Sequence, residues 1–264
     1  MSGNGSFVDS NTNFFRTRAG ATLLGLGIFL LAGGIFLFVI SRDLPSLSQL
    51  ESYKPKLASK VYSTDLKVIY EYYEEKRNFV PLEELPEALV QAAIATEDRK
   101  FREHWGFDLR RFVQAAFINL STLSFREGAS TLTQQLARQL YLTLEKKVTR
   151  KIKELITAIQ IERTYTKTEI LEMYLNHMNF GHGSYGAQSA ATKYFGKDAH
   201  DLSVDECALL IGLLKAPSHY TPLWYPEKAR ARRNLVLRAM HELNYITDEE
   251  LAEYSDKPIK VIES

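Results

Sequence analysis

A run of apolar residues without a single charge extends from Ala19 to Ile40 and is the first clear pattern along the chain. As a helix rising about 1.5 Å per residue, this run would be about 33 Å long, and the hydrocarbon core of a bilayer is about 30 Å thick. A cleaved signal peptide has a shorter apolar core, of about 7–15 residues, followed by a small-residue cleavage site, which the residues after Ile40 do not provide. We therefore predict an uncleaved transmembrane anchor over residues 19–41, preceded by a polar tail over residues 1–18.

After the anchor, the pattern changes first to alternation and then to helical spacing. Residues 57–80 alternate and are rich in Val, Ile and Tyr around a Thr-Asp pair, which predicts a short β-hairpin. From Pro86 onward apolar residues recur at helical spacing, and capping boxes at Thr166, Ser203 and Thr247 mark helix starts. The part of the chain that follows the anchor is therefore predicted to be mainly α-helical.

The overall composition excludes several classes of protein. Hydrophobic residues make up 45% and charged residues 25% of the 264 residues, as in ordinary globular proteins, which excludes a disordered chain. Lys and Arg (33) balance Asp and Glu (32), so no basic field indicates nucleic acid as a partner. Basic residues flank the anchor on both sides, so charge leaves its orientation open. The single cysteine, Cys207, lies in an apolar run and is expected to be buried.

One glycine motif and several absent motifs limit the chemistry further. Gly181–Gly186 fits Gly-x-Gly-x-x-Gly, but a dinucleotide-binding fingerprint follows a strand, whereas this one follows the helical stretch Thr166–Met178. We interpret the glycines as a tight connection between helices. The chain has no His-Glu-x-x-His pair for zinc and no Ser-x-x-Lys for penicillin-type acyl transfer.

The first candidate segment for catalysis, Ala95–Gly106, places Glu97 and Asp98 at the end of an apolar helix, next to an aromatic residue and a histidine. A carboxylate at such a junction is partly desolvated, which suits it to the work of a general base. The alternative is an ordinary charged helix end, and this segment alone does not decide between the two.

The second segment, Gly128–Arg138, combines a glycine, three hydroxyl groups and two side-chain amides at the start of an expected helix. These groups supply hydrogen-bond donors and a positive helix end, which suits phosphate or sugar oxygens. The alternative is a Ser/Thr cap on a structural helix.

The third segment, Arg138–Lys153, has six basic residues against one acidic residue, a net charge of +5, and is followed by Glu154. An acidic group beside several cations stays ionised, although a run of charges is usually a solvated face. Together the three segments offer one carboxylate fit to be a base, a second held ionised, and a cationic patch of the size of a diphosphate. Displacing a phosphate leaving group from a sugar requires this combination.

These segments resemble the peptidoglycan glycosyltransferase domain of class A penicillin-binding proteins in five ordered blocks. The blocks are Glu-Asp-x-x-Phe-x-x-His-x-Gly (Glu97, Asp98, Phe101, His104, Gly106), Gly-Gly-Ser-Thr-x-Thr-Gln-Gln (Gly128, Ser130, Thr131, Thr133, Gln134, Gln135), Arg-Lys-x-x-Glu (Arg150, Lys151, Glu154), Lys-x-x-Ile-Leu-Glu-x-Tyr-Leu-Asn (Lys167 to Asn176) and the stretch from Ala208 to Ser218. Ala129 replaces the second glycine of the second block. The hairpin region and the tail resemble bifunctional members that continue into a transpeptidase domain, so we expect this chain to be a fragment.

The resemblance implies a mainly α, lysozyme-like, two-lobed glycosyltransferase domain with a short β-hairpin and an N-terminal transmembrane helix. The implied parts are a cytoplasmic tail (1–18), the anchor (19–41), a linker with the hairpin (42–80), the glycosyltransferase domain (81–245) and the start of a further linker (246–264). The domain would lie on the outer, periplasmic side of the bacterial cytoplasmic membrane. There it would polymerise lipid II into β-1,4 glycan strands, with inversion at MurNAc C1 and release of undecaprenyl diphosphate.

The resemblance also implies roles for residues. Glu97 would take the proton from the acceptor GlcNAc 4-hydroxyl, and Glu154 would orient the basic cluster or assist the leaving group. The positions where the family binds substrate are matched by Asp98, Phe101, His104, Gly128, Ser130, Thr131, Gln134, Gln135, Arg138, Lys146, Arg150, Lys151 and Asn176. Arg138 stands where Lys is usual, and Lys146 where some relatives have Arg, which changes the hydrogen-bond geometry.

The implied partners are lipid II, the growing undecaprenyl-diphosphate-linked strand, the membrane and other cell-wall synthesis proteins, without nucleic acid. No cofactor is expected to be required, although a divalent cation, Mg²⁺ or Mn²⁺, assists some relatives.

Two other functions stay open on the sequence. A lysozyme-like hydrolase or lytic transglycosylase shares the fold and the polymer but needs no diphosphate patch, so the +5 segment counts against it. A membrane-anchored scaffold with an inactive site is the other, and the presence of Glu97 and Glu154 counts against it. The apolar stretch Phe112–Phe125 also has two interpretations, as the core of a lobe or as a surface that dips into the outer leaflet.

Overall fold

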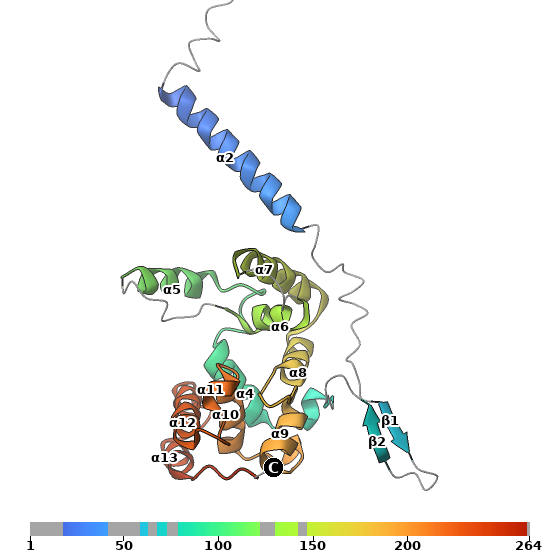
Figure 1. The fold of residues 1–264 in the computed structure, drawn as a ribbon. Helices are drawn as coiled ribbons and strands as arrows, with labels where there is room; N and C mark the ends of the chain where they lie inside the picture. The colour runs from blue at the N-terminus through green and yellow to red at the C-terminus, as the bar shows by residue number, and fades with distance from the viewer. Residues whose placement is uncertain are drawn as a thin grey trace, which may run out of the picture. The chain divides into compact units, whose positions relative to one another are not determined.

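The structure is a computed structural model that describes residues 18–41, 59–62, 68–72, 79–121, 130–141 and 147–262 (Figure 1). The chain divides into two compact units, Met1–Leu44 and Pro45–Ser264, which are described separately. The first unit contains helix α2 (Arg18–Ser41), whose side chains from residue 21 to residue 35 are all exposed. Over the described residues, no helix combines the length and the apolar character needed to cross a membrane. The predicted anchor stays a prediction.

The second unit is mainly helical, as predicted. Its elements are β1 (Ser59–Tyr62), β2 (Val68–Tyr72), η1 (Leu82–Glu84), α4 (Glu87–Glu97), α5 (Leu109–Ser121), α6 (Leu132–Tyr141), α7 (Lys147–Thr164), α8 (Lys167–His177), α9 (Ala187–Phe195), η2 (Ala199–Asp201), α10 (Val204–Leu213), α11 (Pro217–Tyr220), α12 (Pro226–Glu242) and α13 (Asp248–Asp256). β1 and β2 pair antiparallel, with Ser59 opposite Tyr72 and an irregularity after Val61. This pair lies within the stretch predicted as a hairpin, and the residues between the two strands lie outside the described part of the chain.

Local sequence signals account for the helix starts. Complete capping boxes begin α8 at Thr166 and α13 at Thr247, as predicted. At Ser203, the residue before α10, the backbone N–H donates to Glu206 as in a capping box, but the hydroxyl donates to the Asp205 carboxylate. Proline serves as the first residue of α12, where its missing N–H costs no hydrogen bond.

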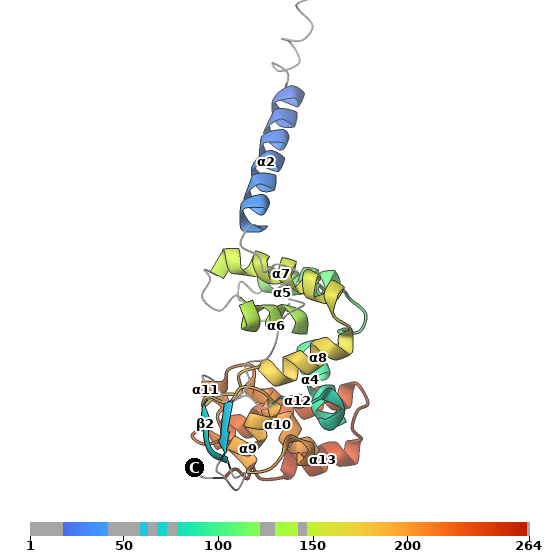
Figure 2. The same ribbon diagram turned by 90° about the vertical axis from the view of Figure 1, so that its right-hand side faces the viewer.

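The core of the second unit forms where α4, α10 and α12 pack against one another (Figures 1 and 2). Fully buried residues from the three helices include Leu89, Leu210 and Leu237. Cys207 belongs to this core, where burial raises the pKa of its thiol, so the thiol is unreactive, as expected. Helix α6 packs on α7 and on α8. The two-lobed shape stays a prediction.

The glycine motif forms a tight connection between α8 and α9, which confirms that interpretation. Gly181, Gly183 and Gly186 all have positive φ angles, of 94°, 74° and 83°. A Cβ atom on Gly186 would lie 2.6 Å from the backbone oxygen of Asn176. Glycine is therefore required here for turn geometry and close packing rather than for a dinucleotide.

Helix α5 exposes several large apolar side chains, although its Ala115 is buried. Phe112, Val113 and Phe117 are 50%, 58% and 73% exposed, and the neighbouring Trp105 is 65% exposed. The interpretation of this stretch as the core of a lobe is wrong for these side chains, because core residues are almost fully buried. An apolar patch of this kind marks an interaction surface.

Candidate active site

Glu97 is the last residue of α4, and its position is fixed from two sides. The backbone N–H of Asp98 still donates to Ile94, whereas Asp98 itself has an extended φ of −157° and ends the helix. The Arg111 guanidinium donates to the Glu97 backbone carbonyl at 2.5 Å. Because the backbone on both sides of Glu97 is held, its side chain leaves the helix end in a defined direction.

The Glu97 carboxylate is partly exposed and has one bonded oxygen. Gln135 Nε2 donates to Glu97 Oε2 at 2.9 Å, and no described residue bonds to Oε1. Gln135 Oε1 in turn accepts from the hydroxyl of Tyr174 on α8, at 3.3 Å. Burial, with a smaller contribution from the Glu97 charge, raises the pKa of Tyr174 well above its usual value, and Arg138 opposes that shift. Gln135 thus lies between Glu97 and Tyr174.

Asp98, the neighbour of Glu97, lies inside the protein. It is 1% exposed, and both carboxylate oxygens lie within 3.0 Å of His104 Nε2. Its Oδ2 also accepts from the backbone N–H of Leu132, the first residue of α6. His104 Nδ1 accepts from the Gly106 N–H, so the ring proton is on Nε2, which donates to Asp98. Asp98 and His104 therefore join the end of α4 to the start of α6.

The start of α6 is capped from within the protein. The Thr131 hydroxyl accepts from the Gln134 N–H and donates to the Gly106 carbonyl, which confirms a threonine cap. Gln134 Nε2 also donates to the Gly106 carbonyl. Asp98 and Thr131 thus occupy two N–H groups of this helix end, which are unavailable to a phosphate. Gly106 has a φ of +91° and lies so close to Ala158 on α7 that a Cβ would approach its backbone to 3.0 Å.

Glu154 holds two cations at the other side of α6. Its carboxylate is 3% exposed and pairs with Lys151 Nζ at 3.0 Å and with Arg150 Nε at 3.3 Å. Lys151 Nζ also donates to Ser130 Oγ at 2.7 Å and to Gln134 Oε1 at 3.2 Å. Lys151 keeps 52% of its side chain exposed despite these contacts. The structure thus brings these residues of the second and third segments together, as predicted.

The basic run does not form one continuous face. Lys153 is only 4% exposed, in contrast to Lys151 two residues earlier. Successive helical residues point in different directions, so one ligand cannot contact the whole run. Gly128 and Lys146, both predicted to bind substrate, lie outside the described residues.

A second ion pair, which the sequence analysis missed, lies next to His104. Glu162 and Lys167 pair at 2.7 Å, and Glu162 Oε1 accepts from the Thr133 hydroxyl on α6. Lys167 also donates to the His104 carbonyl and lies 4.3 Å from the centre of the Phe101 ring, which is fully buried. Lys167 is the first residue of the fourth block quoted above, but nothing in the sequence marked Glu162 as its partner.

Asn176 holds the backbone where the chain enters the helical body. Its Oδ1 accepts from the Val80 N–H, and its Nδ2 donates to the carbonyls of Val80 and Glu172. Glu172 adds a bond from the Leu82 N–H. With its amide occupied and 4% exposed, Asn176 is placed as a backbone clamp, and substrate contact by this residue stays a prediction.

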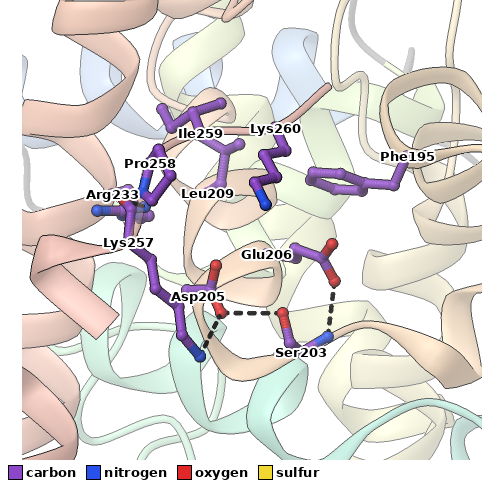
Figure 3. A pocket seen from close by; sticks show the side chains of 10 residues that line it. All are labelled: Phe195, Ser203, Asp205, Glu206, Leu209, Arg233, Lys257, Pro258, Ile259 and Lys260. Carbon is purple, nitrogen blue, oxygen red and sulfur yellow. Dashed lines mark hydrogen bonds and ion pairs between the residues drawn. The ribbon is translucent and has the colours of Figure 1, made fainter. Parts of the chain in front are cut away.

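The cavities and possible metal ligands of the described residues add no further site. No three His, Cys, Asp or Glu side chains there are grouped so as to hold a metal ion. A cavity of about 550 Å³ is lined by Asp98 and by the cations Arg99, Lys100, Arg110 and Arg111. Arg99 and Lys100 pair with Glu242 and Glu103. A smaller cavity, of about 260 Å³, is drawn in Figure 3; it is lined by the start of α10 and by residues 257–260, and contains none of the predicted site residues.

The described residues form a mainly helical domain in which the Glu97 carboxylate is accessible and a cationic cluster lies on the buried Glu154 carboxylate. The sequence matches the family model described as Transglycosylase over residues 65–241, and the chain belongs to the transglycosylase family.

Its curated relatives are considerably longer proteins. Penicillin-binding protein 1A of Aquifex aeolicus is 45% identical over 90% of this chain and 33% of the relative, and that of Vibrio cholerae is 44% identical over 89% and 28%. This chain thus spans about a third of the length of these relatives. The crystal structure of penicillin-binding protein 1A from Haemophilus influenzae aligns with 80% of this chain and 22% of that chain at 27% identity. Its TM-score of 0.47 is too low to establish a shared fold.

Proposed function

We propose that this chain is a peptidoglycan glycosyltransferase that polymerises lipid II into β-1,4-linked glycan strands. The observation that carries the proposal is the arrangement of hydrogen bonds around α6. Gln135 donates to Glu97, and Lys151, which is paired with Glu154, donates to Gln134. One accessible base and one cationic cluster are what a sugar transfer from a diphosphate requires. The family membership and the penicillin-binding protein 1A relatives support the same activity.

In the proposed reaction, Glu97 removes the proton of the acceptor GlcNAc 4-hydroxyl. The oxygen attacks C1 of the donor MurNAc from the face opposite the diphosphate. The new C1–O bond forms as the bond to the diphosphate oxygen breaks, so the configuration at C1 inverts. The electron pair leaves with undecaprenyl diphosphate, and Glu97 keeps the proton until it is passed to solvent.

The cluster on Glu154 is proposed to receive the leaving diphosphate. Lys151 and Arg150 supply positive charge, while the buried Glu154 carboxylate orients both and keeps their side chains from repelling each other. Charge builds on the diphosphate as the bond breaks, so these cations stabilise the transition state more than the bound substrate. Ser130 orients the Lys151 ammonium through its hydroxyl.

Membrane attachment is part of the proposal, with the helical domain on the outer side of the cytoplasmic membrane. The support for it comes from the uncharged sequence of residues 19–40 and from the exposed apolar side chains of α5. A substrate with an undecaprenyl chain stays in the bilayer, so an enzyme that binds its diphosphate works at the membrane surface.

The test is to incubate the purified chain with labelled lipid II in detergent micelles and, separately, with preformed glycan strands. The expected result is polymer from lipid II and unchanged strands. Shortened strands without polymer would instead identify a hydrolase or lytic transglycosylase. The absence of both polymer and shortened strands would identify a scaffold without activity.

A further inference from the structure

The hydrogen bonds around Glu97 extend one step deeper than the residues expected to face substrate. Gln135 lies between two groups, because Nε2 donates to Glu97 and Oε1 accepts from the Tyr174 hydroxyl. The bonds thus connect α4, α6 and α8 in one line, which runs from Glu97 through Gln135 to Tyr174. Tyr174 is fully buried, so no solvent competes for its hydroxyl.

The direction of these bonds follows from what each group can do. A side-chain amide has one donor end and one acceptor end, and a carboxylate that is ionised only accepts. The buried Tyr174 hydroxyl keeps its proton, because burial and the Glu97 charge both disfavour the phenolate. Its donation to Oε1 turns the amide so that Nε2 points toward Glu97. The Glu97 carboxylate favours the same orientation, since it accepts only from Nε2, so without the hydroxyl the amide is held from the Glu97 side alone.

We propose that Tyr174 is a positioning residue which, through Gln135, keeps an N–H donor on Glu97 Oε2 and leaves Oε1 to take the acceptor proton. A hydrogen bond to the ionised form of a carboxyl group favours that form. The inference rests on the proposed function, in which Glu97 is the general base.

Other charges near this line also act on Glu97 and Tyr174. Arg111 from α5 donates to the Glu97 carbonyl, and Arg138 on α6 and the Asp98 carboxylate contribute opposite effects at the Tyr174 hydroxyl. All of them remain when the hydroxyl alone is removed. A change in pH dependence after that removal therefore reports on the line through Gln135.

The test is Tyr174→Phe in the full chain, with Tyr194→Phe as the matched control. Tyr194 is equally buried, and its hydroxyl donates to the Phe180 carbonyl, so its loss is a comparable change outside the site. We expect Tyr174→Phe to move the acidic limb of the pH–rate profile for kcat upward by about half to one pH unit, as the loss of one neutral hydrogen bond implies. Tyr194→Phe should leave the limb in place.

A double-mutant cycle decides whether Gln135 carries the effect. In a Gln135→Ala background, Tyr174→Phe should shift the acidic limb no further. The proposal is overturned if Tyr174→Phe keeps the wild-type limb, or if it shifts the limb equally when Gln135 is absent. Full activity of Glu97→Gln would instead show that Glu97 is not the general base and would overturn the proposed function. A failure of the role proposed for Tyr174 can therefore be distinguished from a failure of the proposed function.

Discussion

Two groups of polar residues meet at α6, and they differ in how much of their side chains solvent can reach. The facing group consists of Glu97, Gln135, Ser130, Arg150, Lys151 and Glu154. The support cluster consists of Asp98, His104, Thr133, Glu162 and Lys167. In the facing group Glu97 is partly exposed and Lys151 is half exposed above the buried Glu154, whereas in the support cluster Asp98 and Glu162 are 1% and 5% exposed.

The contrast is sharpest between Glu97 and Asp98, which are adjacent in sequence. Their side chains have opposite surroundings because α4 ends between them, and the extended backbone of Asp98 turns its carboxylate toward His104. The comparison teaches that an acidic pair in a motif need not be a catalytic pair. One carboxylate is left accessible, and the other holds together the ends of α4 and α6.

The largest effect is expected for Glu97→Gln, which we predict to reduce polymerisation of lipid II by about 10²- to 10⁴-fold, the usual loss of a general base. The amide keeps the shape of the side chain, so the thermal melting temperature should stay at the wild-type value. Glu87→Gln, at the exposed first turn of the same helix, is the matched control and should remain active. Activity of Glu97→Gln within about threefold of wild type would remove Glu97 from the role of base.

The next effect is expected for Lys151→Ala. Losing a charged hydrogen bond to the leaving diphosphate should slow turnover by about 10- to 150-fold, equivalent to about 1.5–3 kcal/mol. The loss should be partly relieved by adding Mg²⁺, which supplies positive charge at the same place. Lys228→Ala, at an exposed lysine on α12, is the control. Equal and small effects of both substitutions would show that Lys151 belongs to a solvated face.

In the support cluster, Asp98→Asn should lower stability as well as activity. Both carboxylate oxygens of Asp98 lie at His104 Nε2–H, so an amide in either orientation directs its own N–H group at that N–H and leaves a buried donor without an acceptor. The expected loss in the free energy of unfolding is roughly 1–3 kcal/mol, measured by urea denaturation. A variant with wild-type stability and lost activity would move Asp98 from the support cluster to the facing group.

The smallest effect is expected for Glu242→Gln, which breaks the Arg99–Glu242 ion pair near the same helix end. Both side chains are at least half exposed, so the pair is expected to contribute about 0–1 kcal/mol to the free energy of unfolding. Measuring the free energy of unfolding of Glu242→Gln and of Asp98→Asn by urea denaturation compares an exposed pair with a buried one directly. A larger loss in the free energy of unfolding for Glu242→Gln than for Asp98→Asn would show that the exposed pair stabilises the fold more than the buried one, contrary to this prediction.

Features that depend on a few consecutive residues were predicted correctly from the sequence. The capping boxes at Thr166 and Thr247 and the glycine connection before α9 all involve partners within a few positions along the chain. The pairing of Lys151 with Glu154 has the same origin, because residues three apart on a helix are neighbours. Such features need only local geometry, which the order of residues already determines.

The tertiary structure decided which side chain of each motif faces outward. Asp98 finds its partner 34 positions away at Leu132, and Asn176 finds Val80 at a separation of 96 positions. No local pattern specifies such contacts, because they form only after distant helices have packed against each other. The polar groups that this packing buries must then find hydrogen-bond partners. The sequence thus determined which residues stand together in motifs and on helices, whereas long-range packing decided that Glu97 is left accessible and that Asp98 is not.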